Sequence, residues 1–179
     1  MGNTKTMKFD WLRGGKTSFP LPLGASVQMG TATYPSSGKF VDMSGGYGRH
    51  AVAASTYLTG WCEVGQWDYT NGKWVPYFLA SGTAGATIVN CIRDLTAVFR
   101  MPLCYATATY TTNWADTQIG LYCDLLASTT GIQQCDPTTA TRNVLIGVGG
   151  LAATAVNLAS TLGDGYVDVM MNPATSIGA

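Results

Sequence analysis

Residues 67–75 read Trp-Asp-Tyr-Thr-Asn-Gly-Lys-Trp-Val, and they contain the clearest local signal in the chain, that of a β-hairpin. An Asn-Gly pair supplies the two positive-φ residues that a type I′ turn requires. We therefore expect a two-residue turn at residues 71–72, with Tyr69 facing Trp74 on the opposite strand. An aromatic pair of this kind stabilises a ladder by up to about 1 kcal/mol.

Further short strand patterns follow this hairpin. We expect strands in the segments 96–101, 104–111, 144–148 and 166–171, the last of them ended by Asn172-Pro173. A single short helix is predicted over residues 151–158. Many short strands separated by glycine turns are typical of an all-β barrel or sandwich. The sequence therefore predicts an all-β protein with a single β-barrel or sandwich-like domain over residues 46–179.

The first 45 residues differ from the rest because glycine and proline recur every few positions. Proline blocks helix formation and removes ladder donors, so residues 1–45 are predicted to form an extended, loop-rich N-terminal arm. Phe9, Trp11 and Leu12 are apolar anchors within this arm. They either close one end of the domain or lie on a neighbouring subunit.

Charge is scarce in the chain. Of 179 residues, 11% are charged, and ten basic and ten acidic side chains give a formal net charge of zero. Nucleic-acid binders need an excess of Lys and Arg, so direct binding to nucleic acid is not expected. No apolar stretch is long enough for a membrane helix. The weak surface charge favours a surface covered by partners, with a monomer solubilised by hydroxyl and amide groups as the alternative.

The sequence offers little for catalysis. His50 is the only histidine, and the five cysteines show no CxxC spacing; they are Cys62, Cys91, Cys104, Cys123 and Cys135. A Cys–His nucleophile pair is possible in principle, but no protease signature surrounds any cysteine. The odd number of cysteines favours buried free thiols over a disulfide framework or a zinc site. We expect no enzyme activity, no cofactor and no metal.

Aromatic residues gather around the predicted hairpin at Trp61, Trp67, Tyr69 and Trp74. Large rings contribute much of the area buried in cores and subunit interfaces, and this is the favoured reading. Aromatic rings on a β-surface can also stack on sugars. A carbohydrate-binding module is therefore the alternative.

Five segments of the C-terminal half resemble the head decoration, or cement, proteins of tailed bacteriophages. They are residues 94–102 (Asp-Leu-Thr-Ala-Val-Phe-Arg-Met-Pro), 119–125 (Ile-Gly-Leu-Tyr-Cys-Asp-Leu), 131–133 (Gly-Ile-Gln), 143–148 (Asn-Val-Leu-Ile-Gly-Val) and 166–173 (Tyr-Val-Asp-Val-Met-Met-Asn-Pro). The resemblance covers residues 88–173, about half of the chain, and consists of strand and turn residues. Where the family would have an acidic residue after the strand at 144–148, this chain has Gly149-Gly150.

The resemblance implies a non-enzymatic virion protein on the outer capsid surface, assembled in the host cytoplasm. Such proteins clamp neighbouring major capsid subunits against internal DNA pressure, often at three-fold positions. The implied partners are the major capsid protein and further copies of this chain, in a homotrimer rather than a dimer. The expected docking residues are Phe9, Trp11 and Leu12, with Trp61 and Trp74 as further interface aromatics. The alternative is a virion-surface carbohydrate-binding module for host adsorption.

Overall fold

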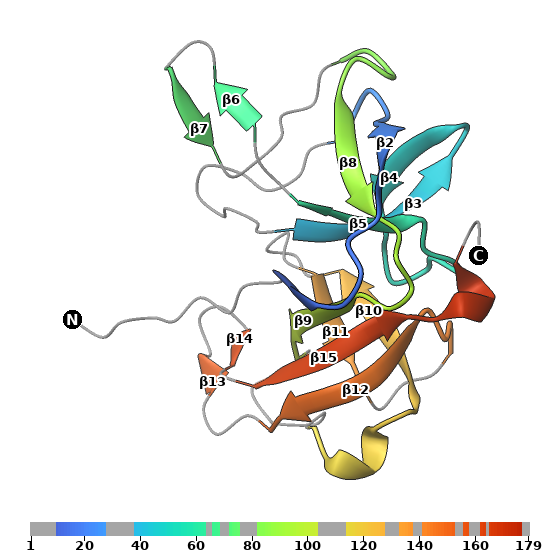
Figure 1. The fold of residues 1–179 in the computed structure, drawn as a ribbon, viewed down its shortest axis with the longest axis vertical. Helices are drawn as coiled ribbons and strands as arrows, with labels where there is room; N and C mark the ends of the chain where they lie inside the picture. The colour runs from blue at the N-terminus through green and yellow to red at the C-terminus, as the bar shows by residue number, and fades with distance from the viewer. Residues whose placement is uncertain are drawn as a thin grey trace.

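The fold is almost entirely β-structure, which confirms the predicted all-β class. The computed structural model describes residues 10–27, 38–63, 66–68, 72–75, 82–103, 114–127, 133–137, 141–152, 156–157, 162–163 and 165–176. All helical structure in these ranges is contained in two short 3-10 helices, η1 (Asp116–Gln118) and η2 (Pro173–Thr175). The strands form two large antiparallel sheets and two small two-stranded ones (Figure 1).

The six-stranded sheet forms the lower half of the molecule in Figure 1. In spatial order its strands are β1 (Asp10–Arg13), β9 (Val98–Pro102), β15 (Tyr166–Met171), β12 (Leu145–Leu151), β10 (Tyr122–Ala127) and β11 (Gln133–Asp136). Alternation of buried and outward residues explains these strands. In β15, for example, Val167, Val169 and Met171 are buried, because alternate side chains of a strand point to the same face.

The five-stranded sheet forms the upper half. In spatial order its strands are β2 (Ser18–Pro22), β8 (Ile88–Ile92), β5 (Gly60–Glu63), β3 (Gly38–Ser44) and β4 (Tyr47–His50). Pro20 and Pro22 lie in β2, which is the first strand in the order. A proline cannot donate to a ladder, so an edge strand is the position in which a sheet tolerates it.

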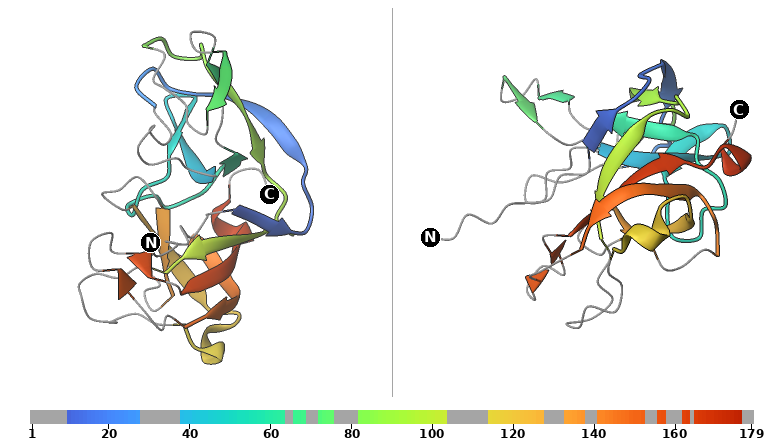
Figure 2. Two further views of the ribbon diagram at one scale, coloured as in Figure 1. Left: turned by 90° about the vertical axis from the view of Figure 1, so that its left-hand side faces the viewer. Right: turned by 60° about the horizontal axis from the view of Figure 1, so that its bottom comes forward.

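Both sheets curl: an isolated bridge joins the two outer strands of the five-stranded sheet, and another joins β11, the last strand of the six-stranded sheet, to β9, the neighbour of its other edge strand β1. Leu23 pairs in parallel with Gly48, linking the end of β2 to β4, and Leu103 pairs in parallel with Cys135, linking the end of β9 to β11. Two rolled sheets therefore stand one above the other, as the turned views in Figure 2 show. The small pairs are β6 (Gln66–Asp68) with β7 (Lys73–Val75), and β13 (Val156–Asn157) with β14 (Leu162–Gly163).

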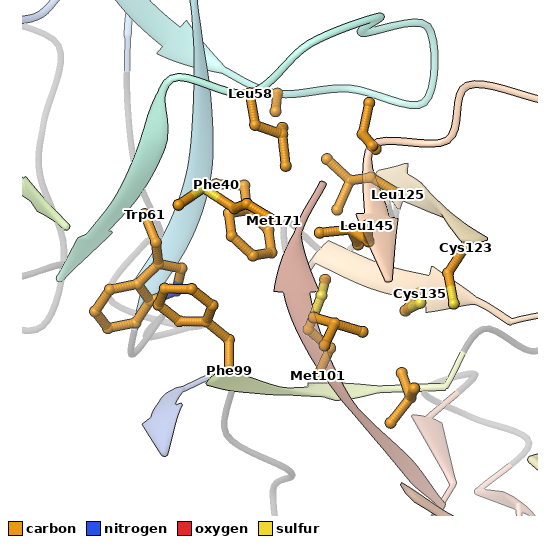
Figure 3. Close-up of a cluster of buried hydrophobic side chains, with 14 of the residues drawn as sticks. Phe40, Leu58, Trp61, Phe99, Met101, Cys123, Leu125, Cys135, Leu145 and Met171 are labelled. Atoms are coloured by element: carbon orange, nitrogen blue, oxygen red, sulfur yellow. The ribbon is translucent and has the colours of Figure 1, made fainter. Parts of the chain in front are cut away.

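A shared core connects the two sheets. Phe40 and Trp61 of the five-stranded sheet pack against Phe99 of the six-stranded sheet, with ring centroids 5.1 Å (Phe40–Phe99) and 5.3 Å (Trp61–Phe99) apart (Figure 3). Gln133 of β11 adds a polar link. Its Oε1 accepts from the Phe40 N–H at 2.7 Å, and its Nε2 donates to the carbonyls of Phe40 and Ala51 at 2.9 and 2.8 Å.

The N-terminal segment is integrated into both sheets over its described residues. β1 pairs with β9, β2 pairs with β8, and β3 lies between β4 and β5. The strands at residues 10–13, 18–22 and 38–44 are therefore parts of the sheets, whereas the sequence predicted an extended, loop-rich arm over residues 1–45. The apolar side chains between the prolines explain the difference, because Leu21, Leu23 and Phe40 are buried.

Two local predictions are wrong. The short helix expected over residues 151–158 is absent from the described part of that segment, since Leu151 ends β12 and residues 156–157 form β13. The two strands pair, but in a different register: Trp67, not Tyr69, lies opposite Trp74. Of the predicted two-residue turn, Asn71 lies outside the described residues, and Gly72 has a φ of 61°, a left-handed conformation that glycine adopts without strain. The strand predicted over residues 104–111 lies outside the described residues.

Candidate interaction surface

The predicted docking residues of the N-terminal segment divide between the core and the surface. Trp11 in β1 is half-buried and packs against the shared core, and the Nζ of Lys16 lies 5.1 Å from the centroid of its ring. Leu12, the next residue, is exposed, as the alternation of a strand requires. Phe9 lies outside the described residues. Of the two described residues, Leu12 is the more exposed and the better placed to contact a partner.

Trp61 and Trp74, the two further aromatic residues predicted at an interface, lie in different parts of the structure. Trp61 has an exposed fraction of 0% and packs on Phe99, so its ring contributes to the core and offers no surface to a partner in this conformation. Trp74 lies in β7, opposite Trp67 of β6. The sequence could not separate these cases, because an aromatic residue in a strand suits both a core and an interface.

An exposed apolar area that the sequence analysis did not identify lies beside η1. Ile119 and Leu121 each have an exposed fraction of 55%, and Tyr122, the first residue of β10, has one of 45%. Tyr122 lies directly opposite Ile146 of β12, and Ile146 lies opposite Met170 of β15; both are half-buried. Tyr122, Ile146 and Met170 thus lie side by side on three neighbouring strands, and Ile119 and Leu121 lie in the segment between η1 and β10; we name these five uncharged residues the η1 patch. Large exposed apolar side chains in a contiguous group mark interaction sites more often than scattered ones do.

Two backbone hydrogen bonds join the segment after η1 to Gly147 of β12. The N–H of Gly120 donates to the carbonyl of Gly147, and the N–H of Gly147 donates to the carbonyl of Leu121, at 2.8 and 3.0 Å. Trp114, which is nearly buried, covers β12 at Gly147 and Gly150, where a Cβ would come within 3.1 and 2.5 Å of its ring. The glycines of β12 thus make room for the indole, and the indole supports the loop. A rigid support reduces the entropy lost when a partner binds.

The polar residues of β3 and β4 form a structural cluster. Asp42 is buried, and its carboxylate accepts from Nε and Nη2 of Arg49 at 2.6 and 3.3 Å and from the hydroxyl of Ser55. Burial lowers the pKa of Lys39 to about 8, and burial, together with the nearby charge of Lys39, lowers the pKa of His50 to about 4. His50 is therefore a neutral group beside a saturated ion pair, an arrangement that stabilises the junction of β3 and β4.

The cysteines correct the expectation of free thiols in part. Cys62 of β5 and Cys91 of β8 lie directly opposite each other, with Cα atoms 4.3 Å apart, and form a disulfide. Cys123 and Cys135 are free and buried in the six-stranded sheet, where the hydrogen bond from Cys135 lowers the pKa of the Cys123 thiol. The signal that the sequence analysis missed is one of register, because only strand pairing brings residues 62 and 91 together.

A Cys–His nucleophile pair finds no support among these residues. Cys62 and Cys91 are consumed by the disulfide, and the free thiols of Cys123 and Cys135 belong to the other sheet from His50. Cys104 lies outside the described residues.

One carboxylate pair is brought together by the fold. Asp124 of β10 lies opposite Asp136 of β11. The oxygens of Asp124, however, accept three backbone N–H groups, those of residues 141–143, at 2.9 to 3.0 Å. This carboxylate therefore fixes the loop before β12, and its oxygens are occupied where a general acid or base would need them free.

No group of three or more potential metal ligands occurs within the part of the chain that the structure describes. No helix in the same residues is long and apolar enough to cross a membrane. Comparisons with protein-family models, with curated proteins and with solved structures found no match. The geometry thus leaves the η1 patch and Leu12 as the features best suited to an interaction.

Proposed function

We propose that this chain is a non-enzymatic structural protein of a bacteriophage virion, which binds the outer capsid shell and cements neighbouring major capsid subunits. The observation that carries the proposal is the η1 patch, a group of uncharged apolar side chains, three of them exposed, beside a hydrogen-bonded loop in a chain with 11% charged residues. The resemblance of residues 88–173 to head decoration proteins supports the same reading. In this role the protein requires no cofactor and no catalytic group.

The mechanism is binding energy alone. Fully burying a Leu, Ile or aromatic side chain contributes about 1.5 to 3 kcal/mol, so a few anchors provide most of the affinity of an interface. Ile119, Leu121 and Tyr122 are anchors of this kind. A decoration protein that contacts two capsid subunits at once raises the free energy needed to separate them. Further copies of this chain, in a homotrimer, would multiply these contacts.

Surface substitution tests the proposal. Leu121→Asp places a charge at one of the two most exposed residues of the η1 patch, and we expect it to weaken co-sedimentation with undecorated capsid shells by at least tenfold, since an unpaired buried charge costs several kcal/mol. Ile88→Asp is the matched control, because Ile88 is similarly exposed, at 62%, but lies on the five-stranded sheet. Equal binding of both variants and the wild type would contradict the proposed site.

A deletion that tests the docking role of the N-terminal segment must leave its strands in place. Removing residues 2–19 would also remove β1 and the start of β2. Deleting residues 2–9 leaves both strands in place and tests Phe9 and its neighbours. We expect this deletion to weaken shell binding without lowering the melting temperature.

A second candidate function is a virion-surface carbohydrate-binding module. The observation that favours it is the register of the β6–β7 pair, in which Trp67 lies opposite Trp74. It predicts binding on a glycan array that Trp74→Ala abolishes. Absence of binding to every glycan of the host surface would reject this candidate.

A further inference from the structure

The Cys62–Cys91 disulfide lies across the shortest junction between neighbouring strands of the five-stranded sheet. Over the described residues, β5 and β8 share two register pairs, Trp61 with Ile92 and Cys62 with Cys91. The pair β2–β8 has five such pairs, and β3–β4 and β3–β5 have four each. A junction with few ladder bonds opens at a lower free energy than its neighbours, unless something else holds it closed.

The opposite side of the rolled sheet has a second short junction. There β2 meets β4 through the bridge between Leu23 and Gly48 and through the N–H of Gly24, which donates to the carbonyl of Gly48 at 3.0 Å. The sheet therefore consists of two units, the ribbon β2–β8 and the ribbon β4–β3–β5. The two short junctions join these ribbons.

The apolar cluster inside this sheet depends on both ribbons. Its buried members are Leu21, Leu23, Val41, Cys62, Val89 and Cys91, so the disulfide itself supplies two of six residues. The cluster of the shared core has eighteen buried members. A small apolar cluster provides little stability by itself, and small cores commonly rely on a covalent cross-link.

We propose that the Cys62–Cys91 bond is a redox latch: when it is reduced, the β2–β8 ribbon separates from β4–β3–β5 while the six-stranded sheet stays folded. Both sulfurs are buried, with exposed fractions of 0%, so a reductant attacks during a transient local opening that exposes one sulfur, and reduction then lets the ribbons stay apart. The latch goes beyond the proposed docking function and does not depend on it.

The chemistry is ordinary thiol–disulfide exchange. One thiolate of a dithiol reductant attacks a sulfur of the pair and forms a mixed disulfide, and the other cysteine leaves as a thiolate that takes up a proton. The second thiol of the reductant then displaces the first cysteine. The two cysteines gain two electrons and two protons, which the reductant loses as it becomes a cyclic disulfide. A small-molecule disulfide closes the latch by the reverse sequence.

The second cysteine pair provides an internal control. Cys135 lies opposite Leu125, not Cys123, so the two free thiols of the six-stranded sheet are offset in register. They remain thiols in the structure although they are hydrogen-bonded neighbours (Figure 3). Redox control is thus placed at the β5–β8 junction. Substituting both free thiols by alanine should leave the latch intact.

Hydrogen exchange of the full chain, followed by mass spectrometry before and after complete reduction with dithiothreitol, tests the latch. We expect amide protection in residues 18–22 and 88–92 to fall at least tenfold on reduction, a loss that the double variant Cys62→Ala/Cys91→Ala reproduces without reductant. Protection in residues 145–151 and 166–171 should stay unchanged. The variant Cys123→Ala/Cys135→Ala, kept oxidised, should match the wild type in residues 88–92.

Two results would overturn the proposal. Unchanged protection in residues 88–92, with reduction confirmed by alkylation of the new thiols, would show that the junction stays closed without the bond. Equal loss of protection in both sheets would show that the bond stabilises the whole chain and controls no local opening. The wild-type experiment decides the matter even where the alanine variant fails to fold.

Discussion

Gln133 is the side chain whose replacement should most directly disturb the joint between the two sheets. It lies in β11 of the six-stranded sheet and is buried, with its amide bound to the backbone of Phe40 in β3 and to the carbonyl of Ala51. The substitution Gln133→Leu keeps a side chain of similar volume and removes all three hydrogen bonds. It leaves the Phe40 N–H and the Ala51 carbonyl without this partner in the interior.

The expected loss in the free energy of unfolding follows from the backbone groups that Gln133 no longer binds. A buried donor or acceptor left unsatisfied costs about 1 to 3 kcal/mol. The Phe40 carbonyl still accepts from the Ala51 N–H at 3.1 Å, so two groups, not three, are stranded. The apolar leucine offsets part of this cost, and we expect a net loss of about 3 kcal/mol in the free energy of unfolding. For a chain of this size, that corresponds to a fall of about 6 to 12 °C in melting temperature.

Thermal and urea denaturation measure this loss, and Gln134→Leu is the matched control. Gln134 is the next residue of the same strand and equally buried, but its Nε2 has no hydrogen-bond partner among the described residues. Replacing it should cost less than about 1 kcal/mol, or stabilise the fold, because a costly buried amide is removed. If Gln133→Leu proves no more destabilising than Gln134→Leu, the polar link between the sheets does not act as described.

Three further predictions follow from the structure. Replacing Cys62 and Cys91 by alanine should lower the free energy of opening of the five-stranded sheet by up to about 3.6 kcal/mol, the chain-entropy value for a loop of 29 residues, while the six-stranded sheet keeps its own; hydrogen exchange in increasing urea, read separately for each sheet, measures it. The pKa of His50 is lowered to about 4 in the folded chain, so the unfolded chain binds this proton first as the pH falls below 6.5. The free energy of unfolding should therefore decline between pH 6.5 and pH 4. A His50→Gln variant should show a smaller decline when urea titrations are repeated across this pH range. Gly150→Ala places a Cβ 2.5 Å from the indole ring of Trp114 and should lower the free energy of unfolding by about 1 to 3 kcal/mol. In Gly149→Ala the new Cβ meets nothing closer than 3.7 Å, so the loss should be smaller. Equal melting temperatures of the two variants would contradict this packing.

Three strands of the C-terminal half, β9, β12 and β15, could be predicted from sequence because local pattern decides them, whereas β10 and β11 were not predicted. Alternating apolar residues before Pro102 and before Asn172 correspond to β9 and β15, and the apolar run from Val144 corresponds to β12. Gly149 and Gly150, which follow the strand predicted over residues 144–148, continue β12. They do so because Trp114 occupies the space that side chains would fill, and this packing joins residues far apart in the chain.

The N-terminal half could be predicted less well, because its pairing is non-local. Prolines at 20 and 22 indicated a segment outside the sheets, whereas an edge strand accommodates them. The disulfide follows from the register of β5 against β8, which no spacing in the sequence reveals.

The candidate site, too, could be predicted only in part from the sequence. Composition indicated an uncharged surface suited to partners, but only the fold brings residues of β10, β12 and β15 together beside the segment that follows η1. Trp61, expected at an interface, lies in the shared core instead. Residue type is enough to predict that a side chain is apolar; tertiary pairing decides which sheet face it covers.

Quantitative mass spectrometry of the purified source virion, with this chain counted against the major capsid subunit, tests the proposed function most directly. The account predicts a ratio near one, or a simple fraction of one, as expected for a protein that covers the capsid lattice. A few copies per particle would favour an adsorption module at a vertex. Absence of the chain from the virion would contradict the proposed function.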